Sequence, residues 1–276
     1  MSNQNELLKI ISEILNADNL NSIEDAIDYL NSLPEKKIII FENLQRLFVR
    51  KVDGFAALKV FFEIISRTNK NIFWLSTCTL YSWIYLNKTI HILDHFGYVV
   101  ELKKLNEQQI TELVSKRHRV SGYKIEYVPD ENTLKSKSFK KIPEDERQVY
   151  LRKKYFSDLN KFAQSNITLA LIYWLRSARE IVNDVIKIGP PPELDYSFLE
   201  NLSNDKMFAL AVLLIHDGLR IEDHSKMFNV TVSQSRLLFL LMSDDGILVN
   251  QSNVYMINPL LYRQIVRVLK SKNILH

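Results

Sequence analysis

A short run of β-branched and aromatic residues that ends in two polar residues is the strongest constraint on this chain. Ile38-Ile39-Ile40-Phe41 is followed directly by Glu42 and Asn43. A continuous apolar run of this length predicts a strand that is buried on both faces of a parallel sheet. Ligands of such sheets bind beyond the carboxyl ends of the strands. Glu42 and Asn43 therefore occupy a candidate ligand-binding position, the alternative being that they simply end a buried strand.

The alternation of strand and helix continues to residue 102. A second apolar run, Ile72-Phe73-Trp74-Leu75, ends in Ser76-Thr77, as the first ends in Glu42-Asn43. A helical pattern separates the two runs, and another leads from Thr79 to a third predicted strand, Tyr98–Leu102. This order predicts a parallel three-stranded sheet with right-handed crossovers.

Composition narrows the class of protein. The chain has 276 residues, of which 46% are hydrophobic and 25% charged, and its 6 glycines favour an ordered, helix-rich globular protein. The net charge of +4 is too small to require a nucleic-acid partner. A single cysteine, Cys78, excludes an intramolecular disulfide and favours a reducing compartment. With no apolar stretch of about 20 residues and no signal peptide, we expect a cytoplasmic protein without a membrane span.

The remainder of the chain is predicted to be mainly helical. Helical patterns cover residues 106–122, 146–163 and 166–181, interrupted by a polar, basic loop at 129–145. The segment Ile188-Gly189-Pro190-Pro191-Pro192 predicts a linker. Three helices between residues 205 and 243 then precede two strands at 247–257 and a final helix. Three helices followed by a hairpin are typical of a winged helix.

The order of these parts resembles the C-terminal part of an AAA+-type ATPase, in particular the branch of origin-recognition initiators and STAND ATPases. Residues 38–43 resemble a Walker B strand, Ser76 or Thr77 stands where sensor 1 would be, and Asn166 lies near the sensor 2 position. The fold implied is α/β plus all-α and mostly helical. Its parts would be N-terminal helices (1–35), a residual α/β core (36–102), a helical lid (103–187), a linker (188–202) and a winged helix (203–276).

The resemblance also implies a set of ligands. Glu42 would hold Mg²⁺, and the nucleotide would contact Glu42, Ser76, Thr77 and Asn166. ATP and Mg²⁺ are thus expected as cofactors from the resemblance only.

Three departures from the family pattern argue against nucleotide chemistry. The six glycines nowhere form the Gly-x-x-x-x-Gly-Lys-Ser/Thr loop that cradles phosphates. Asn43 occupies the position of the catalytic base, and an amide does not accept a proton near neutral pH. Asn166 stands where the family usually has an arginine. We therefore expect no catalytic residue and no ATP binding or hydrolysis by this chain, which would be a natural truncation, a split gene product or a late-started gene model.

That interpretation predicts protein partners. They would be a missing N-terminal ATPase half, or a second copy that associates through the unpaired edge of the sheet.

A non-enzymatic module built on the winged helix is the alternative. DNA contacts are conceivable for Gln234, Arg236, Arg263 and Arg267. The third helix of that region is otherwise strongly apolar from Leu237 to Met242, and Asp244-Asp245 follow it. Phosphates would be repelled by the acidic pair, so this pattern favours protein contacts.

Overall fold

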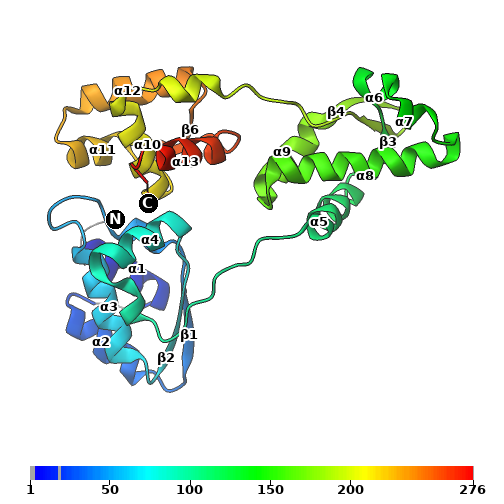
Figure 1. Ribbon diagram of the computed structural model, residues 1–276. Coiled ribbons are helices and arrows are strands. Elements are labelled where there is room, and N and C mark those ends of the chain that lie inside the picture. The colour runs from blue at the N-terminus through cyan, green and yellow to red at the C-terminus, as the bar shows by residue number, and fades with distance from the viewer. Residues whose placement is uncertain (1–3, 18–19, 276) are drawn as a thin grey trace. The chain divides into compact units, whose positions relative to one another are not determined.

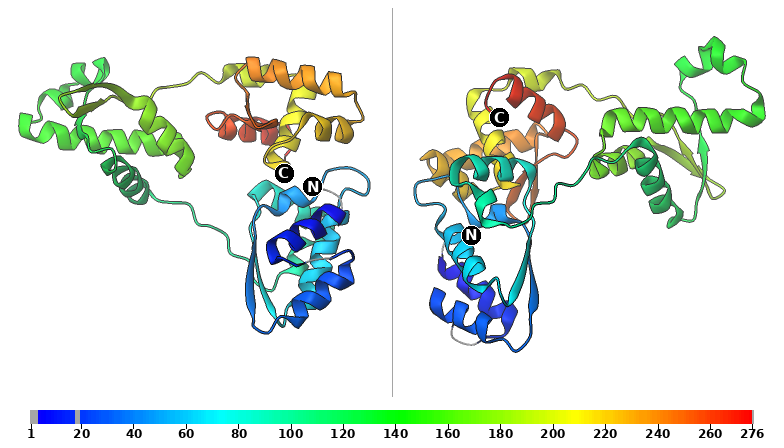
Figure 2. Two further views of the ribbon diagram at one scale, coloured as in Figure 1. Left: turned by 180° about the vertical axis from the view of Figure 1, so that it is seen from behind. Right: turned by 60° about the horizontal axis from the view of Figure 1, so that its bottom comes forward.

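The computed structural model describes residues 4–17 and 20–275, which are mostly helical and form two compact units (Figures 1 and 2). The first unit joins the N-terminal part, up to residue 99, to the C-terminal part from residue 198 onward. The second unit comprises residues 100–197. No helix in the described part of the chain is both long and apolar enough to span a membrane.

The N-terminal half of the first unit contains a two-stranded parallel sheet with helices packed on one face. The sheet pairs Ile38 with Phe73 and Ile40 with Leu75. Its elements are α1 (Gln4–Leu15), α2 (Ile23–Ser32), β1 (Lys37–Phe41), the 3-10 helix η1 (Leu44–Leu47), α3 (Ala56–Thr68), β2 (Ile72–Ser76), α4 (Leu80–Ile90) and the 3-10 helix η2 (Ile92–His95). Ser22 and Asp25 form a capping box that starts α2, because each side chain accepts a hydrogen bond from the other residue's backbone N–H.

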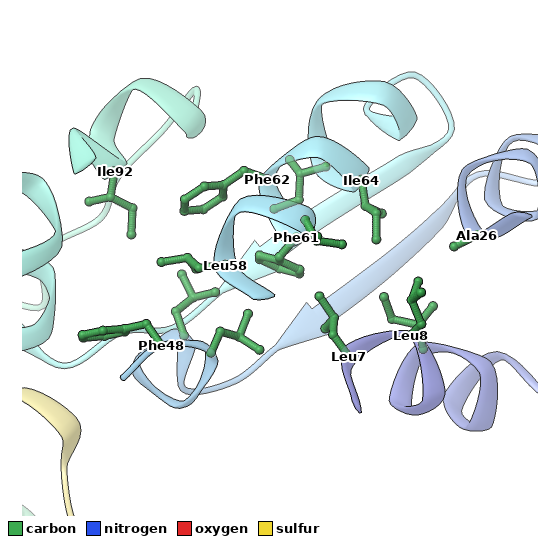
Figure 3. Close-up of a cluster of buried hydrophobic side chains, with 14 of the residues drawn as sticks. Leu7, Leu8, Ala26, Phe48, Leu58, Phe61, Phe62, Ile64 and Ile92 are labelled. Atoms are coloured by element: carbon green, nitrogen blue, oxygen red, sulfur yellow. The ribbon is translucent and has the colours of Figure 1, made fainter. Parts of the chain in front are cut away.

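The core of this half is built around α3. Leu58, Phe61 and Ile64 are fully buried on α3, with side chains of α1 and α2 beside them (Figure 3). Ile39 and Trp74 pack onto the same cluster from the sheet. The inner face of the sheet is therefore covered by α3, with α1 and α2 beyond it (Figure 1).

The expected third strand is wrong, and so is the expectation that the first strand is buried on both faces. The sheet has the order β1-β2, and residues 98–102 form no strand. Val100 is 71% exposed, while Ile38 and Ile40 on the outer face of β1 are 70% and 60% exposed. The physical reason is that helices pack on the inner face of this sheet, whereas its outer face meets solvent.

The second unit combines helices with a three-stranded sheet. Strand β5 lies between β3, to which it is parallel, and β4, to which it is antiparallel. The elements are α5 (Glu107–Arg119), β3 (Lys124–Tyr127), α6 (Glu131–Lys135), α7 (Lys137–Lys140), α8 (Glu144–Ala163), α9 (Ile167–Ser177), β4 (Ala178–Val182) and β5 (Val185–Ile188).

Two expectations for this unit need correction. The helix expected over 166–181 ends at Ser177, because residues 178–182 pair with β5 across a tight turn. Asn183 and Asp184 form that turn with positive φ angles of 48° and 61°, which suit a two-residue hairpin. The basic loop expected at 129–145 contains α6 and α7, and the Asp130 side chain caps α6 by accepting a hydrogen bond from the Thr133 N–H at 2.6 Å.

The C-terminal half of the first unit has the predicted order of helix, helix, helix, hairpin and helix. After the 3-10 helix η3 (Ser197–Asn201), its elements are α10 (Asn204–His216), α11 (Ile221–Phe228), α12 (Val232–Asp244), β6 (Leu248–Gln251), β7 (Val254–Ile257) and α13 (Tyr262–Ser271). Thr231 and Gln234 form a capping box that starts α12. The apolar run of this helix begins at Leu237, three residues after Gln234. Phe239 and Met242 of α12 are fully buried in this half.

The two halves of the first unit contact each other along α4 and α10. The Ser82 hydroxyl of α4 donates a hydrogen bond to the carbonyl oxygen of Ile215. The rings of Phe48 and His216 lie 4.6 Å apart between centroids. The ammonium group of Lys270 on α13 lies 5.8 Å from the centre of the Tyr81 ring.

Candidate site at the carboxyl ends of the parallel strands

The carboxyl ends of β1 and β2 bring two of the predicted site segments together. Phe41 pairs with Ser76, and the Thr77 N–H donates to the Phe41 carbonyl at 3.1 Å. Beyond the strands, the Asn43 N–H donates to the Thr77 Oγ1 at 2.9 Å, and the Leu44 N–H donates to the Thr77 carbonyl at 2.9 Å. Residues 42–44 and 76–77 therefore form one hydrogen-bonded edge.

Asn43 has a structural role at this edge. Its backbone is left-handed, with φ 65° and ψ 59°, a conformation that asparagine tolerates better than most residues. Its Oδ1 accepts a hydrogen bond from the Gln45 Nε2 at 3.1 Å. Gln45 is only 1% exposed, and its Oε1 accepts from the Thr79 N–H at 3.4 Å. The Asn43 carboxamide thus helps to hold the chain reversal after β1.

Glu42 and Ser76 differ in their surroundings. The Glu42 side chain is exposed to solvent at the end of β1. The Ser76 Oγ is buried and has no hydrogen-bond partner among residues 4–17 and 20–275. A buried hydroxyl without a partner is unusual, because its desolvation is not compensated.

The residues at this edge do not fit a nucleoside triphosphate with its Mg²⁺. A phosphate cradle needs backbone N–H groups that point at the ligand, but those of Asn43 and Leu44 already donate to Thr77. Mg²⁺ is usually held by one or two carboxylates together with phosphate oxygens. Glu42 supplies one carboxylate, and the described part of the chain has no cluster of three or more His, Cys, Asp or Glu side chains arranged for a metal ion.

A set of buried and half-buried polar residues lies next to this edge and was not anticipated from the sequence. The Thr79 Oγ1 and the Ser82 Oγ are 2.5 Å apart. Burial raises the pKa of the Cys78 thiol to about 12, so it is not a reactive thiolate at neutral pH. Burial likewise lowers the pKa of His216 to about 4, which leaves the ring neutral. The sequence signal was Gln45, an uncharged polar residue close to the apolar residues Leu44, Leu47 and Phe48.

Asn166, the fourth predicted nucleotide contact, belongs to the second unit. Its Oδ1 accepts a hydrogen bond from the Leu169 N–H at 3.0 Å, so Asn166 is the N-cap of α9. Local helix capping accounts for an asparagine at this position.

The four predicted nucleic-acid contacts fall into different environments. Gln234 belongs to the capping box of α12, in which its Oε1 accepts from the Thr231 N–H at 2.9 Å. Arg236 and Arg267 are exposed. Arg263 is half-buried beside Tyr81 of α4, and desolvation lowers its pKa. The structure therefore leaves Arg236 and Arg267 accessible and places Arg263 against the neighbouring half.

Comparison with known proteins yields solved structures of distant similarity. No protein-family model matches the chain, and no curated protein matches it. Cdc6p from Pyrobaculum aerophilum is 15% identical, with 96% of this chain and 77% of that chain covered and a TM-score of 0.33. The RuvB Holliday junction branch migration motor of Thermotoga maritima is 13% identical, with 90% and 75% covered and a TM-score of 0.28. Both are AAA+ ATPases, but TM-scores at this level do not decide the fold family or the function of this chain.

Proposed function

We propose that this chain is an AAA+/STAND-like protein that does not hydrolyse ATP and acts through protein contacts. The observation that carries the proposal is the hydrogen bonding within the edge beyond β1 and β2. The backbone N–H groups of Asn43 and Leu44 both donate to Thr77, and the Asn43 Oδ1 accepts from the Gln45 Nε2. These two backbone N–H groups cannot bind a phosphate without first breaking their bonds to Thr77.

The proposed descent from an ATP-binding protein rests on the arrangement of parts. Two parallel strands joined by a helix end side by side in polar residues. In the proposed descent, Glu42 corresponds to a Mg²⁺ ligand of the ancestral site. The helical second unit takes the place of a lid, with Asn166 at the start of α9. Residues 203–276 take the place of a winged helix. The proposal is that this arrangement persists as a scaffold, with Glu42, Ser76, Thr77 and Asn166 as vestiges of the nucleotide site.

A thermal melt with and without Mg·ATP tests the loss of nucleotide binding. Ligand at 100 times its Kd would add about 2.7 kcal/mol to the free energy of unfolding. We expect no ATP-dependent shift in the native chain or in Glu42→Ala. Glu35→Ala is the matched control, since it removes an exposed carboxylate near the opposite end of β1. An ATP-dependent rise that disappears in Glu42→Ala and persists in Glu35→Ala would refute the proposal.

DNA binding by the winged-helix region is the second candidate, favoured by the exposure of Arg236 and Arg267. If that candidate were correct, affinity for duplex DNA would fall steeply with salt. Arg236→Ala and Arg267→Ala would each weaken it, whereas Arg263→Ala would also disturb the packing beside Tyr81. Protein contact is the better-supported use, because Leu237, Leu240 and Leu241 are exposed on the helix that would have to enter the DNA groove. We therefore expect no salt-dependent binding in a fluorescence anisotropy titration.

A further inference from the structure

Helix α12 has a second apolar face that points away from the core of its own half. Ser235, Phe239 and Met242 are buried against α11 and β6. Leu237, Leu240 and Leu241 are 59%, 46% and 48% exposed. Their spacing of three and four residues places the three leucines in one stripe along the helix. Figure 1 shows α12 at the top of this half, with α11 below it.

The charges on α12 are arranged symmetrically about the middle of this stripe. Arg236 lies four residues before Leu240, Asp244 lies four residues after it, and both are exposed. They are the charged residues of the segment Val232–Asp244. The neighbouring Asp245 is already paired with Lys206, whose Nζ lies 2.6 Å from its Oδ2. The stripe thus carries one positive and one negative charge at equal distances from its centre.

We propose that α12 is a self-association surface, on which two copies of the chain pair their α12 helices antiparallel about a two-fold axis at Leu240. An isologous contact of this kind requires a surface that is complementary to itself. With Leu240 opposite Leu240 of the second copy, each Arg236 lies level with Asp244 of that copy. The same pairing covers Leu237 and Leu241. A parallel arrangement in register would instead bring like charges together.

This pairing extends the proposed function by naming one protein partner, a second copy of the chain. A helix of 13 residues is about 20 Å long, which is short for an interface of the usual ~800 Å² on each side. We therefore expect a weak, reversible dimer whose population rises with protein concentration.

Sedimentation velocity over a roughly hundredfold range of concentration, with charge-reversed variants, tests the pairing. Arg236→Asp and Asp244→Arg each place like charges opposite one another and should weaken the dimer at least about tenfold. The double variant restores the opposite pairs with reversed sign and should return the dissociation constant to within about threefold of the native value. Circular dichroism spectra and melting curves verify that each variant is folded.

Two further variants locate the contact. Leu240→Asp should abolish the dimer, whereas Ile40→Asp, on the exposed outer face of β1, should leave it intact. A chain that stays monomeric throughout overturns the inference, as does a double charge variant that remains as weak as the single ones. Loss of the dimer in Ile40→Asp but not in Leu240→Asp would place self-association on the sheet and overturn it too. A chain that binds ATP in the melt and still dimerises through α12 would refute the proposed function only.

Discussion

The first unit contains two small sheets of two strands each, and the two sheets differ in how far their apolar side chains are buried. In the hairpin of β6 and β7, Leu248, Tyr255 and Ile257 are buried, and the polar residues Asn250 and Gln251 are exposed. In the parallel pair of β1 and β2, apolar side chains stand on both faces. Ile39 and Trp74 pack inward, while the outer face consists of four exposed residues, Ile38, Ile40, Phe73 and Leu75.

The difference shows that apolar sequence and burial are separate properties. In a hairpin with one solvated face the burial of side chains alternates, and along β7 Tyr255 and Ile257 are buried while Val254 and Met256 are half-buried. A continuous apolar strand needs cover on both faces, and β1 and β2 have cover on one. Register places Ile38 beside Phe73 and Ile40 beside Leu75, so the outer residues form one contiguous patch. Contiguous exposed apolar patches mark contact surfaces.

The largest expected effect contrasts the two faces of the parallel sheet. Phe61 is fully buried on the inner side, where the centroids of the Phe61 and Phe41 rings lie 4.5 Å apart. Phe61→Ala should lower the free energy of unfolding by about 3–5 kcal/mol, the usual cost of removing a buried ring. Phe73→Ala, on the outer side, should cost less than about 1 kcal/mol. Urea denaturation of both variants measures the difference.

Equal costs for the two variants would contradict the comparison, because they would mean that the outer face is covered in solution. Repeating Phe73→Ala at several protein concentrations separates the two ways of covering it. A cost that grows with concentration indicates a second copy on the sheet, and a constant cost indicates cover from the same chain.

The sequence was sufficient to predict the parallel pairing of the first two strands and the order of elements after residue 203. Both depend on local patterns: a β-branched run that ends in polar residues, and turn and cap residues between helices. It was not sufficient for Tyr98–Leu102, whose composition favours a strand. A strand exists only where an edge accepts its hydrogen bonds, and that depends on tertiary context. In the second unit, the turn residues Asn183 and Asp184 were the local signal for the hairpin, and the apolar pattern of the preceding helix concealed it.

For the candidate site, residue types were easier to predict than their roles. The meeting of residues 42–43 with residues 76–77 follows from parallel strands that end at the same edge. The use of the Asn43 carboxamide by Gln45 does not follow, because it depends on the left-handed backbone at Asn43 and on the burial of Gln45. The burial of His216 could not be predicted from the sequence either, because its ring packs against Phe48, a residue far away in the chain.

The second prediction concerns the pH dependence of stability, which depends on two buried histidines of the C-terminal half. His216 and His224 are buried, and desolvation lowers the pKa of each from 6.5 to about 4. The unfolded chain therefore binds more protons than the folded chain between these values. Stability should be intact above about pH 6.5 and fall as the pH drops toward 4, by on the order of 3 kcal/mol for each histidine.

Chemical denaturation at several pH values measures this loss. His216→Gln and His224→Gln should each flatten the pH dependence in that window, and the double variant should flatten it most. A wild-type stability that does not change between pH 6.5 and 4 would show that neither ring is desolvated in solution.

The smallest expected effect distinguishes the two hydroxyls at the end of β2. Thr77→Val removes the acceptor of the Asn43 N–H and should destabilise the chain by about 1 kcal/mol. Ser76→Ala is the matched control, because its buried Oγ has no hydrogen-bond partner among the described residues and its removal relieves a desolvation penalty. We expect Ser76→Ala to be neutral or slightly stabilising in a thermal melt. If Ser76→Ala instead destabilised the chain as much as Thr77→Val, the Ser76 hydroxyl would have a bonding partner in solution. The edge of the parallel sheet would then resemble a ligand-binding site more than an edge whose hydrogen bonds are made within the chain.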